Sequence, residues 1–457
     1  RNDAEQEGPA MTGSRRPRTN VMTRCALLPT SLAALALSGA ADADIATSKQ
    51  NSQDSVAVTD AQQESSAGRF VLVDDQLRAR AVNVIEVNPA AVLFDDASGD
   101  REAVPLENVL VLMREVGATI GGGTEQFANK EGFVVGSSKS GGAAILGSVL
   151  RLTDGRRLVG KYDARLMDDA PENVIRWSHA WLGVIEVPLE RIASLAFIGS
   201  AEPPAQGAGD VLRLRNGDVL AGFIVGIDDD VAFELDDGTV IDIPVERIEA
   251  MTMVNPPADP TGLRLWFDDG TVIGARSVRL GDDRVLRFDG PLLTRLKMNE
   301  VDGLSSPRVD LERVEAMEFR PSRLIGLAEL DVEEVDRVEP RYVLPRPERV
   351  GPPQPAGLDA VAISGPIRVT WRIPAGSERF STRAVLPEFA ATYGSAELIL
   401  VVDDEEVFRA RLDGASRAKE INVPLSGRRL TLTLTSGGDG PVQDIIHLER
   451  PMILRGQ

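Results

Sequence analysis

The stretch that decides the fold is residues 210–254, DVLRLRNGDVLAGFIVGIDDDVAFELDDGTVIDIPVERIEAMTMV. It opens with alternating residues, turns at Asn216-Gly217, and continues as short β-rich runs separated by Asp-rich turns. Asn-Gly favours a tight hairpin because both residues accept positive φ. Pro244 has no N–H to donate, so we expect it to end a strand, and Ile248–Met253 predicts a last strand. Five short strands in one such stretch predict a small, strongly bent β-barrel.

The same pattern recurs along most of the chain. Openings that resemble the one at Leu212 begin at Leu150 and Leu263, and each runs into an Asn-Gly or Asp-Gly turn. The comparable closing motifs are Pro105-Leu-Glu-Asn-Val109, Pro188-Leu-Glu-Arg-Ile192, Pro244-Val-Glu-Arg-Ile248 and, without proline, Asp310-Leu-Glu-Arg-Val314. We therefore predict tandem repeats of a small β-barrel. The predicted copies are residues 69–115, 148–199, 210–254 and 262–320, of which the first is the weakest match.

Each opening resembles the strand-turn-strand start of Sm-like and SH3-like small barrels, over roughly residues 70–320. Sm-like proteins commonly bind RNA, and the resemblance by itself implies that activity. The composition argues against it, because a formal net charge of −20 repels phosphate backbones and anionic membrane surfaces. We expect no nucleic-acid partner.

The N-terminal region has the pattern of an export signal. Within residues 1–43, arginines precede an apolar run, and Ala41-Asp-Ala43 offers a small-x-small cleavage site. A membrane anchor is the alternative, but the run is shorter than the roughly 20 residues that a span needs, and Pro29 interrupts it. We predict a secreted or periplasmic protein with cleavage near Ala43 and no transmembrane span in the mature chain. Cys25, the only cysteine, would be removed with the signal, so no disulfide is expected.

Two further segments are predicted to lack regular structure. Residues 44–68 contain few large apolar side chains and predict a disordered linker. Residues 116–147 form a Gly/Ser-rich insertion. Its run GFVVGSSKSGG does not fit a phosphate-binding loop, because Ser138 rather than glycine precedes Lys139.

The remaining residues, 324–457, predict a different kind of domain. Short β-rich runs dominate it, and Leu430, Leu432 and Leu434 alternate with threonines. This period of two is typical of strands with one buried and one solvent-facing side. We therefore predict a C-terminal jelly-roll β-sandwich, which makes the whole chain all-β.

The order of motifs in this domain resembles the novel putative carbohydrate-binding module (NPCBM) family, which has a galactose-binding-like fold. The matching stretches are Leu398–Phe408, the run Val423-Pro-Leu-Ser-Gly-Arg-Arg-Leu-Thr-Leu432 and Gly437–Leu454. The family usually ends in an Asp-His-Ala-Asp-Trp-like run. Here Asp444 is kept, but Ile445-Ile446-His447 follows it. The resemblance implies glycan binding, or a sandwich that has kept its fold and lost its sugar.

Composition favours a binding protein over an enzyme. The chain has only two histidines, His179 and His447, neither of them in a context typical of a nucleophile. Carboxylates are so abundant that a glycosidase-like pair arises by chance, so a glycoside hydrolase ranks last among the hypotheses. We predict no catalytic residues, no metal and no cofactor. Asp-Gly pairs raise structural calcium as an alternative, but the EF-hand order is absent.

Two functional hypotheses therefore remain open. In the first, the sandwich binds glycans at the cell envelope or outside the cell, and Asp444 and His447 contact the ligand. In the second, the protein is an envelope scaffold whose repeats present acidic loops to envelope proteins. Trp177, Trp181, Trp266 and Trp371 are interpreted as core residues rather than as sugar-binding platforms.

Overall fold

The computed structural model describes residues 69–115, 147–162, 173–198, 201–289, 307–338, 345–351, 353–437 and 443–456. The predicted signal region, the linker and all but the last residue of the Gly/Ser-rich insertion lie outside these residues. The regular structure of these residues consists of β-strands and short 3₁₀ helices, so the all-β prediction is confirmed. No helix of the described residues is long and apolar enough to span a membrane.

Residues 210–254 fold strand by strand as predicted, and we call them module 3. Its elements are β11 (Asp210–Leu214), β12 (Val219–Ile227), β13 (Asp230–Glu234), β14 (Val240–Pro244), η4 (Val245–Arg247) and β15 (Ile248–Thr252). Antiparallel pairing gives the order β15-β11-β12-β13-β14. Pro244 is the last residue of β14, as its missing N–H predicts.

The first turn of module 3 differs in detail from the prediction. Gly217 has φ +91°, whereas Asn216 does not have positive φ. The Gly217 N–H donates to the Leu214 carbonyl, and the Leu214 N–H donates to the Asp218 carbonyl at 2.8 Å. This pattern is a type I turn followed by a left-handed glycine, which makes a three-residue loop rather than a two-residue one. Asn216 contributes instead through its side-chain oxygen, which accepts the Asp218 N–H.

Three other segments repeat this order of elements. Module 1 contains β1 (Arg69–Asp74), β2 (Ala79–Val87), β3 (Ala91–Asp95), β4 (Arg101–Pro105), η1 (Leu106–Asn108) and β5 (Val109–Arg114). Module 2 contains β6 (Ser148–Leu152), β7 (Arg157–Tyr162), β8 (Val174–His179), β9 (Gly183–Pro188), η3 (Leu189–Arg191) and β10 (Ile192–Ala196). Module 4 contains β16 (Leu263–Phe267), β17 (Val272–Ala275), β18 (Ser277–Leu280), β19 (Val285–Asp289), β20 (Arg308–Asp310), η6 (Leu311–Arg313) and β21 (Val314–Glu318).

The modules contact one another through strand pairings that do not follow their order in the sequence. Modules 1 and 4 are joined by β5–β21 and β2–β18, and modules 2 and 3 by β10–β15. A single residue pair, Val272 and Arg157, joins β17 of module 4 to β7 of module 2. The order of contact is therefore 1-4-2-3, with β12 of module 3 at one end.

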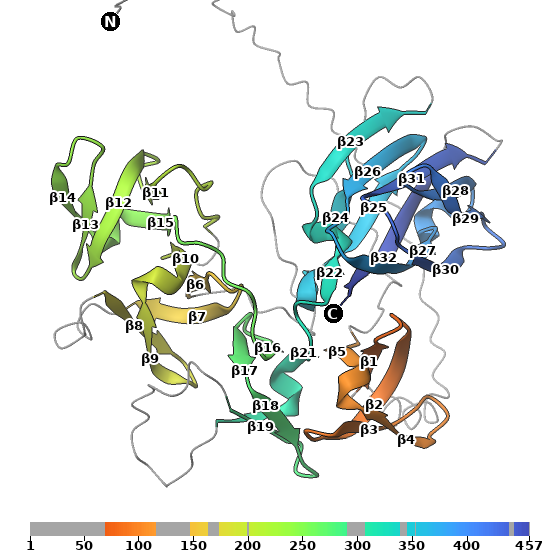
Figure 1. Ribbon diagram of the computed structural model, residues 1–457, viewed down its shortest axis with the longest axis horizontal. Helices are drawn as coiled ribbons and strands as arrows, with labels where there is room; N and C mark the ends of the chain where they lie inside the picture. Colours follow the sequence, from red (N-terminus) through yellow and green to blue (C-terminus); the bar gives the residue numbers. More distant parts are fainter. Residues whose placement is uncertain are drawn as a thin grey trace, which may run out of the picture. The chain divides into compact units, whose positions relative to one another are not determined.

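The C-terminal residues form two antiparallel sheets, as the predicted sandwich requires (Figure 1). One sheet has the order β24 (Glu348–Val350), β25 (Ala360–Ser364), β32 (Ile445–Arg455), β27 (Ser377–Val385) and β30 (Ala418–Pro424), with β22 (Leu324–Gly326) pairing to β32. The other has the order β23 (Val332–Arg337), β26 (Ile367–Arg372), β31 (Arg429–Ser436), β28 (Ala396–Val402) and β29 (Glu405–Leu412). The connecting 3₁₀ helices are η7 (Leu327–Glu329), η8 (Pro355–Gly357) and η9 (Glu388–Ala390).

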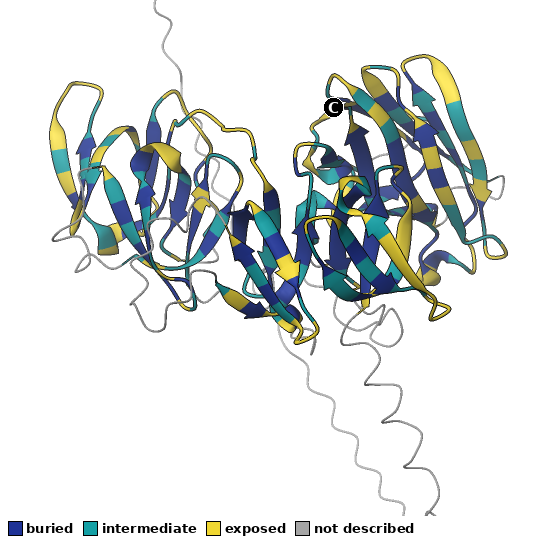
Figure 2. Ribbon diagram, turned by 60° about the horizontal axis from the view of Figure 1, so that its bottom comes forward, coloured by how far each residue is buried: buried dark blue, intermediate teal, exposed yellow. Residues whose placement is uncertain are grey.

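The sandwich core lies between these two sheets. The predicted alternation along β31 is confirmed in part, because Leu430, Leu432 and Leu434 are buried and Thr431 and Thr435 are half-buried, whereas Thr433 is buried as well. The alternation of buried and solvent-facing residues is visible along the strands in Figure 2. Part of the sheet that contains β32 is covered, because Met452 and Leu454 belong to one buried apolar cluster with Val71 and Leu110 of module 1.

Candidate functional site

His447 lies on the outer face of the sandwich sheet that contains β32. It alternates along β32 with the buried Ile446 and Leu448, so its imidazole points away from the core. Its neighbours in register are Ala362 on β25 and Val385 on β27. Both are small or medium apolar residues, which leaves the half-buried imidazole accessible between them.

The segment after β27 brings two aromatic side chains to this end of the sheet. Phe389, within η9, is 57% exposed, and Tyr393 is 67% exposed. The ring centroid of Phe389 lies 6.5 Å from that of His447, with the two planes tilted by 59°. Large exposed apolar rings are uncommon on a soluble protein unless they meet a partner. Phe389 and His447 therefore form one surface rather than two separate features.

Asp444 lies beneath this surface rather than on it. It is only 2% exposed, and its Oδ1 accepts the Ser395 N–H at 3.4 Å. Its carbonyl oxygen accepts the Gly365 N–H at 2.6 Å. The Ser395 hydroxyl in turn accepts a hydrogen bond from Arg411 Nη2 at 2.8 Å. Asp444 thus connects the start of β32 to the segment that carries Tyr393.

Gly394 shows how tightly this segment packs against its neighbours. A Cβ at Gly394 would lie 2.7 Å from the carbonyl oxygens of both Ala390 and Gln443, which is closer than real Cβ contacts. The Gly394 N–H also donates to the Ala390 carbonyl at 2.7 Å. The absence of a side chain at Gly394 lets the two segments meet, so the position of Tyr393 is fixed by backbone packing.

The imidazole of His447 is uncharged at neutral pH. Burial lowers the pKa of His447 below its ordinary value of 6.5, and the nearby Glu449 carboxylate raises it by less. A neutral imidazole has one N–H donor and one acceptor nitrogen. It can therefore exchange hydrogen bonds with a hydroxyl group in either direction.

Sequence analysis located His447 and Asp444 but missed Phe389 and Tyr393. The signal was present in Leu386-Pro-Glu-Phe-Ala-Ala-Thr-Tyr-Gly394, where two aromatic residues stand between predicted strands in a chain with 4% aromatic residues.

Of the tryptophans, Trp177 and Trp371 are buried, as predicted. Trp181 and Trp266 are half-buried and pack against the hydrophobic clusters, so they lie at the edge of the core.

The second histidine, His179, is part of a contact between modules 2 and 4. Its Nε2 lies 2.9 Å from the Thr271 hydroxyl, and it is only 3% exposed. Burial lowers the pKa of His179 to about 4. Beside it, the Trp181 indole N–H donates to Asp269 at 3.0 Å, and Arg313 stacks over the Trp181 ring. These contacts describe a structural junction.

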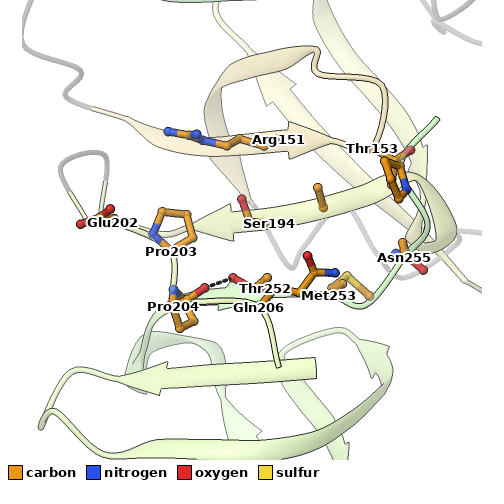
Figure 3. Close-up of a pocket in the computed structure, with 12 residues that line it drawn as sticks. Arg151, Thr153, Ser194, Glu202, Pro203, Pro204, Gln206, Thr252, Met253 and Asn255 are labelled. Carbon is orange, nitrogen blue, oxygen red and sulfur yellow. Dashed lines mark hydrogen bonds between the residues drawn. The ribbon is translucent and has the colours of Figure 1, made fainter. Parts of the chain in front are cut away.

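A separate pocket of about 400 Å³ lies where modules 2 and 3 meet (Figure 3). Its lining includes Arg151 on β6, Ser194 on β10 and Thr252 on β15, with Pro203 and Pro204 along one side. The Thr252 hydroxyl is used internally, donating to the Pro204 carbonyl at 2.6 Å. The lining is mainly short side chains and proline, and it has no aromatic face.

Asp403 lies in the acidic turn between β28 and β29. Asp403 has φ +51°, and its Oδ1 accepts the N–H groups of Arg428 and Arg429, each at 3.0 Å. Asp403 is therefore a structural turn residue.

Among the residues that the structure describes, no group of three or more His, Cys, Asp or Glu side chains is arranged to hold a metal ion.

Comparison with known proteins adds the following. No family model and no curated protein matches the sequence. Among solved structures, the CBM51 module from Clostridium perfringens GH95, in complex with methyl-galactose, is 15% identical over 28% of this chain and 99% of its own, with a TM-score of 0.24. The tandem CBM51 modules of Sp3GH98 from Streptococcus pneumoniae are 10% identical over 58% of this chain and 77% of theirs, with a TM-score of 0.25. The module CBM36, in complex with calcium and xylotriose, is 12% identical over 29% of this chain and 98% of its own, with a TM-score of 0.18.

These solved structures are carbohydrate-binding modules. Their sequence identities and TM-scores are low, so the assignment of a β-sandwich rests on the strand pairings given above. The resemblances to the NPCBM family and to Sm-like barrels stay predictions.

Proposed function

We propose that the protein is an exported, non-catalytic protein that binds a glycan on the outer face of its C-terminal sandwich. The observation that carries this proposal is the exposed ring of Phe389 beside the half-buried imidazole of His447, with a second exposed ring, Tyr393, four residues further along the chain. Export is supported by the N-terminal sequence pattern alone.

The chemistry of the site suits a sugar ring. Sugars present apolar C–H faces that pack on aromatic rings, and hydroxyl groups that need a few placed polar partners. Phe389 and Tyr393 are both exposed and lie four residues apart, the first within η9 and the second just after it. His447 supplies a hydrogen-bonding group at the edge of that surface.

In this proposal the two residues expected from the sequence have different roles. His447 contacts the ligand directly. Asp444 is buried, and it acts through Ser395 by holding the Tyr393 segment in place. Replacing Asp444 should therefore weaken binding by loosening the site rather than by removing a ligand contact.

The site favours binding over hydrolysis. A glycosidase needs two carboxyl groups on opposite sides of the scissile bond. Around His447, the nearest acidic residue in the strand is Glu449, which is paired with Arg383 at 3.1 Å. We therefore propose a non-catalytic role, with calcium not required.

The test is a glycan-array screen of the purified chain, run with calcium and with a chelator. The proposal expects retention of a defined set of glycans in both conditions. The same screen of the Phe389→Ala/Tyr393→Ala double variant should lose that set, with circular dichroism confirming that the variant is folded. Retention that is unchanged in the folded double variant would overturn the site, and a wild-type chain that retains no glycan would overturn the function.

The scaffold hypothesis has one observation in its favour, the exposed apolar face that Val219, Phe223 and Val225 form on β12 of module 3. If the array is silent, that face becomes the primary candidate for function.

A further inference from the structure

The pocket between modules 2 and 3 has a polar floor that continues across neighbouring strands. Arg157 on β7 pairs in register with Arg151 on β6, which pairs with Ser194 on β10. Ser194 in turn pairs with Thr252 on β15. Paired residues point to the same side of a sheet, so these side chains form one row. Arg151, Ser194 and Thr252 of this row line the pocket (Figure 3).

The linker between β10 and β11 forms a wall of the pocket. Arg213 on β11 donates from Nη1 to the Glu202 carbonyl at 3.0 Å. The Thr252 hydroxyl donates to the Pro204 carbonyl at 2.6 Å. Ala201 packs against a small apolar cluster to which β6, β10 and β15 contribute. The linker is thus fixed to the sheet at three points, so the pocket is part of the folded modules.

Arg151 carries a charge that no other residue of the pocket neutralises. Its guanidinium makes no hydrogen bond or ion pair with any other residue that the structure describes, and Glu202, the acidic residue of the lining, is exposed. Its neighbour in the row is Arg157, and like charges directly opposite each other on a sheet are unfavourable. Burial and then the charge of Arg151 lower the pKa of Arg157, with Asp269 acting in the opposite direction. An anion bound beside Arg151 would relieve this repulsion.

A second hydrogen-bond donor beside Arg151 is also unused. Ser194 is only 6% exposed, yet its hydroxyl makes no hydrogen bond to another described residue. Buried hydroxyl groups usually have a partner, so the missing one indicates that something else supplies it. A guanidinium and a hydroxyl therefore lie side by side on the floor of the pocket with their donors available.

We propose that this pocket binds the carboxylate group of a small organic acid, which pairs with Arg151 and accepts a hydrogen bond from Ser194. The planar fork of a guanidinium matches the two oxygens of a carboxylate. The apolar part of the acid packs against Pro203, Pro204 and Met253, which also line the pocket. The volume of about 400 Å³ falls within the range of roughly 300–1,000 Å³ that is typical of small-molecule pockets.

The lining suits a carboxylate better than a phosphate or a sugar. A phosphate carries up to two negative charges and is commonly held by several backbone N–H groups. Here the prolines have no N–H, and the Glu202 carboxylate would repel a second negative charge. The lining also has no aromatic ring against which a sugar could pack. The site therefore differs in chemistry from the proposed glycan surface on the sandwich.

The experiment titrates the purified full chain with benzoate and with hexanoate, by isothermal titration calorimetry and ligand-observed NMR. At least one acid should bind with a Kd below about 1 mM, and benzamide, the uncharged match of benzoate, should bind at least about tenfold more weakly than benzoate. Arg151→Gln should weaken binding of the acids at least about tenfold, because it removes the charged fork. Arg279→Gln, at an exposed position on β18, makes the same change in net charge and should leave the affinity unchanged.

Arg151→Lys provides a second variant, since it keeps the charge without the planar fork, and it should weaken benzoate binding more than Arg279→Gln does. Circular dichroism reports whether each variant is folded. Failure of both acids to bind at about 20 mM would overturn the proposal. So would benzamide that binds as tightly as benzoate, or folded Arg151 variants that keep the wild-type affinity. An equal loss in Arg279→Gln would assign the effect to net charge, and inorganic phosphate that displaces benzoate at equal concentration would overturn the choice of a carboxylate.

Discussion

At the scale of single residues, the exposed rings of Phe389 and Tyr393 should account for most of the binding energy. Replacing either by alanine should weaken the affinity for a glycan identified on the array by at least about tenfold, or about 1.4 kcal/mol, because a stacked ring face is lost. Isothermal titration calorimetry measures this effect. Val332→Ala, at an exposed apolar residue on the other sheet, is the control and should leave the affinity unchanged. Equal losses at all three positions would show that the effect is not local.

His447 should make binding depend on pH in one direction. Burial lowers the pKa of His447, so the imidazole is neutral at neutral pH and gains a proton only in acid below its ordinary value of 6.5. The affinity should therefore be constant from about pH 8 to 6.5 and fall as the pH is lowered further. His447→Gln, which keeps a donor and an acceptor, should remove that fall. Persistence of the same acid loss in the variant would assign it to another group.

The candidate site was only partly predictable from the sequence at this scale. His447 and Asp444 were predicted because they lie in Gly437–Leu454, a stretch that resembles the end of the NPCBM family. Their roles were not predictable, because burial separates the accessible imidazole from the carboxylate beneath it. Phe389 and Tyr393 were missed since a residue's exposure in an irregular segment has no periodic signal.

At the scale of elements, β21 contains a buried acid that should affect stability. Glu318 is 2% exposed, and burial raises its pKa from 4.5 to about 7, with Arg264 at 4.0 Å offsetting this only in part. Between these two pKa values, the unfolded chain loses the proton while the folded chain keeps it. The free energy of unfolding should therefore fall as the pH rises from about 4.5 to 7.

Glu318→Gln removes that proton exchange and tests the argument. The variant should be more stable than the wild type at about pH 8, by up to roughly 3 kcal/mol, and similar to it near pH 4.5. Denaturant unfolding at both pH values measures the difference. Glu312→Gln, at an exposed position of η6, should show no such dependence. A Glu318→Gln variant that is no more stable at pH 8 would contradict the buried-acid account.

Strands were predictable where one face is buried. β11 of module 3 and β31 were found because apolar and polar residues alternate along them. β23 was not predicted as a strand, because it pairs only with β26 and its residues are exposed or half-buried. The hairpin at Gly217 was placed correctly, but its loop length depends on hydrogen bonds that Asn-Gly alone does not specify.

At the scale of the whole molecule, the order of contacts among the modules could not be predicted. The modules share one strand order, apart from the second strand of module 4, which is divided into β17 and β18, so the sequence pattern does not distinguish which neighbour each one meets. The 1-4-2-3 order depends on pairings between distant strands such as β5 and β21, which are stabilised by a few specific contacts. Arg114, for example, donates to the Leu311 carbonyl across that junction at 2.6 Å.

The central claim is that a glycan binds at the sandwich surface formed by Phe389, Tyr393 and His447. The most direct measurement is a crystal structure of the chain with a glycan identified on the array. The account predicts a sugar ring packed against Phe389 or Tyr393, with a hydroxyl group hydrogen-bonded to His447. A sugar bound in the pocket near Arg151, or anywhere else on the modules, would contradict it.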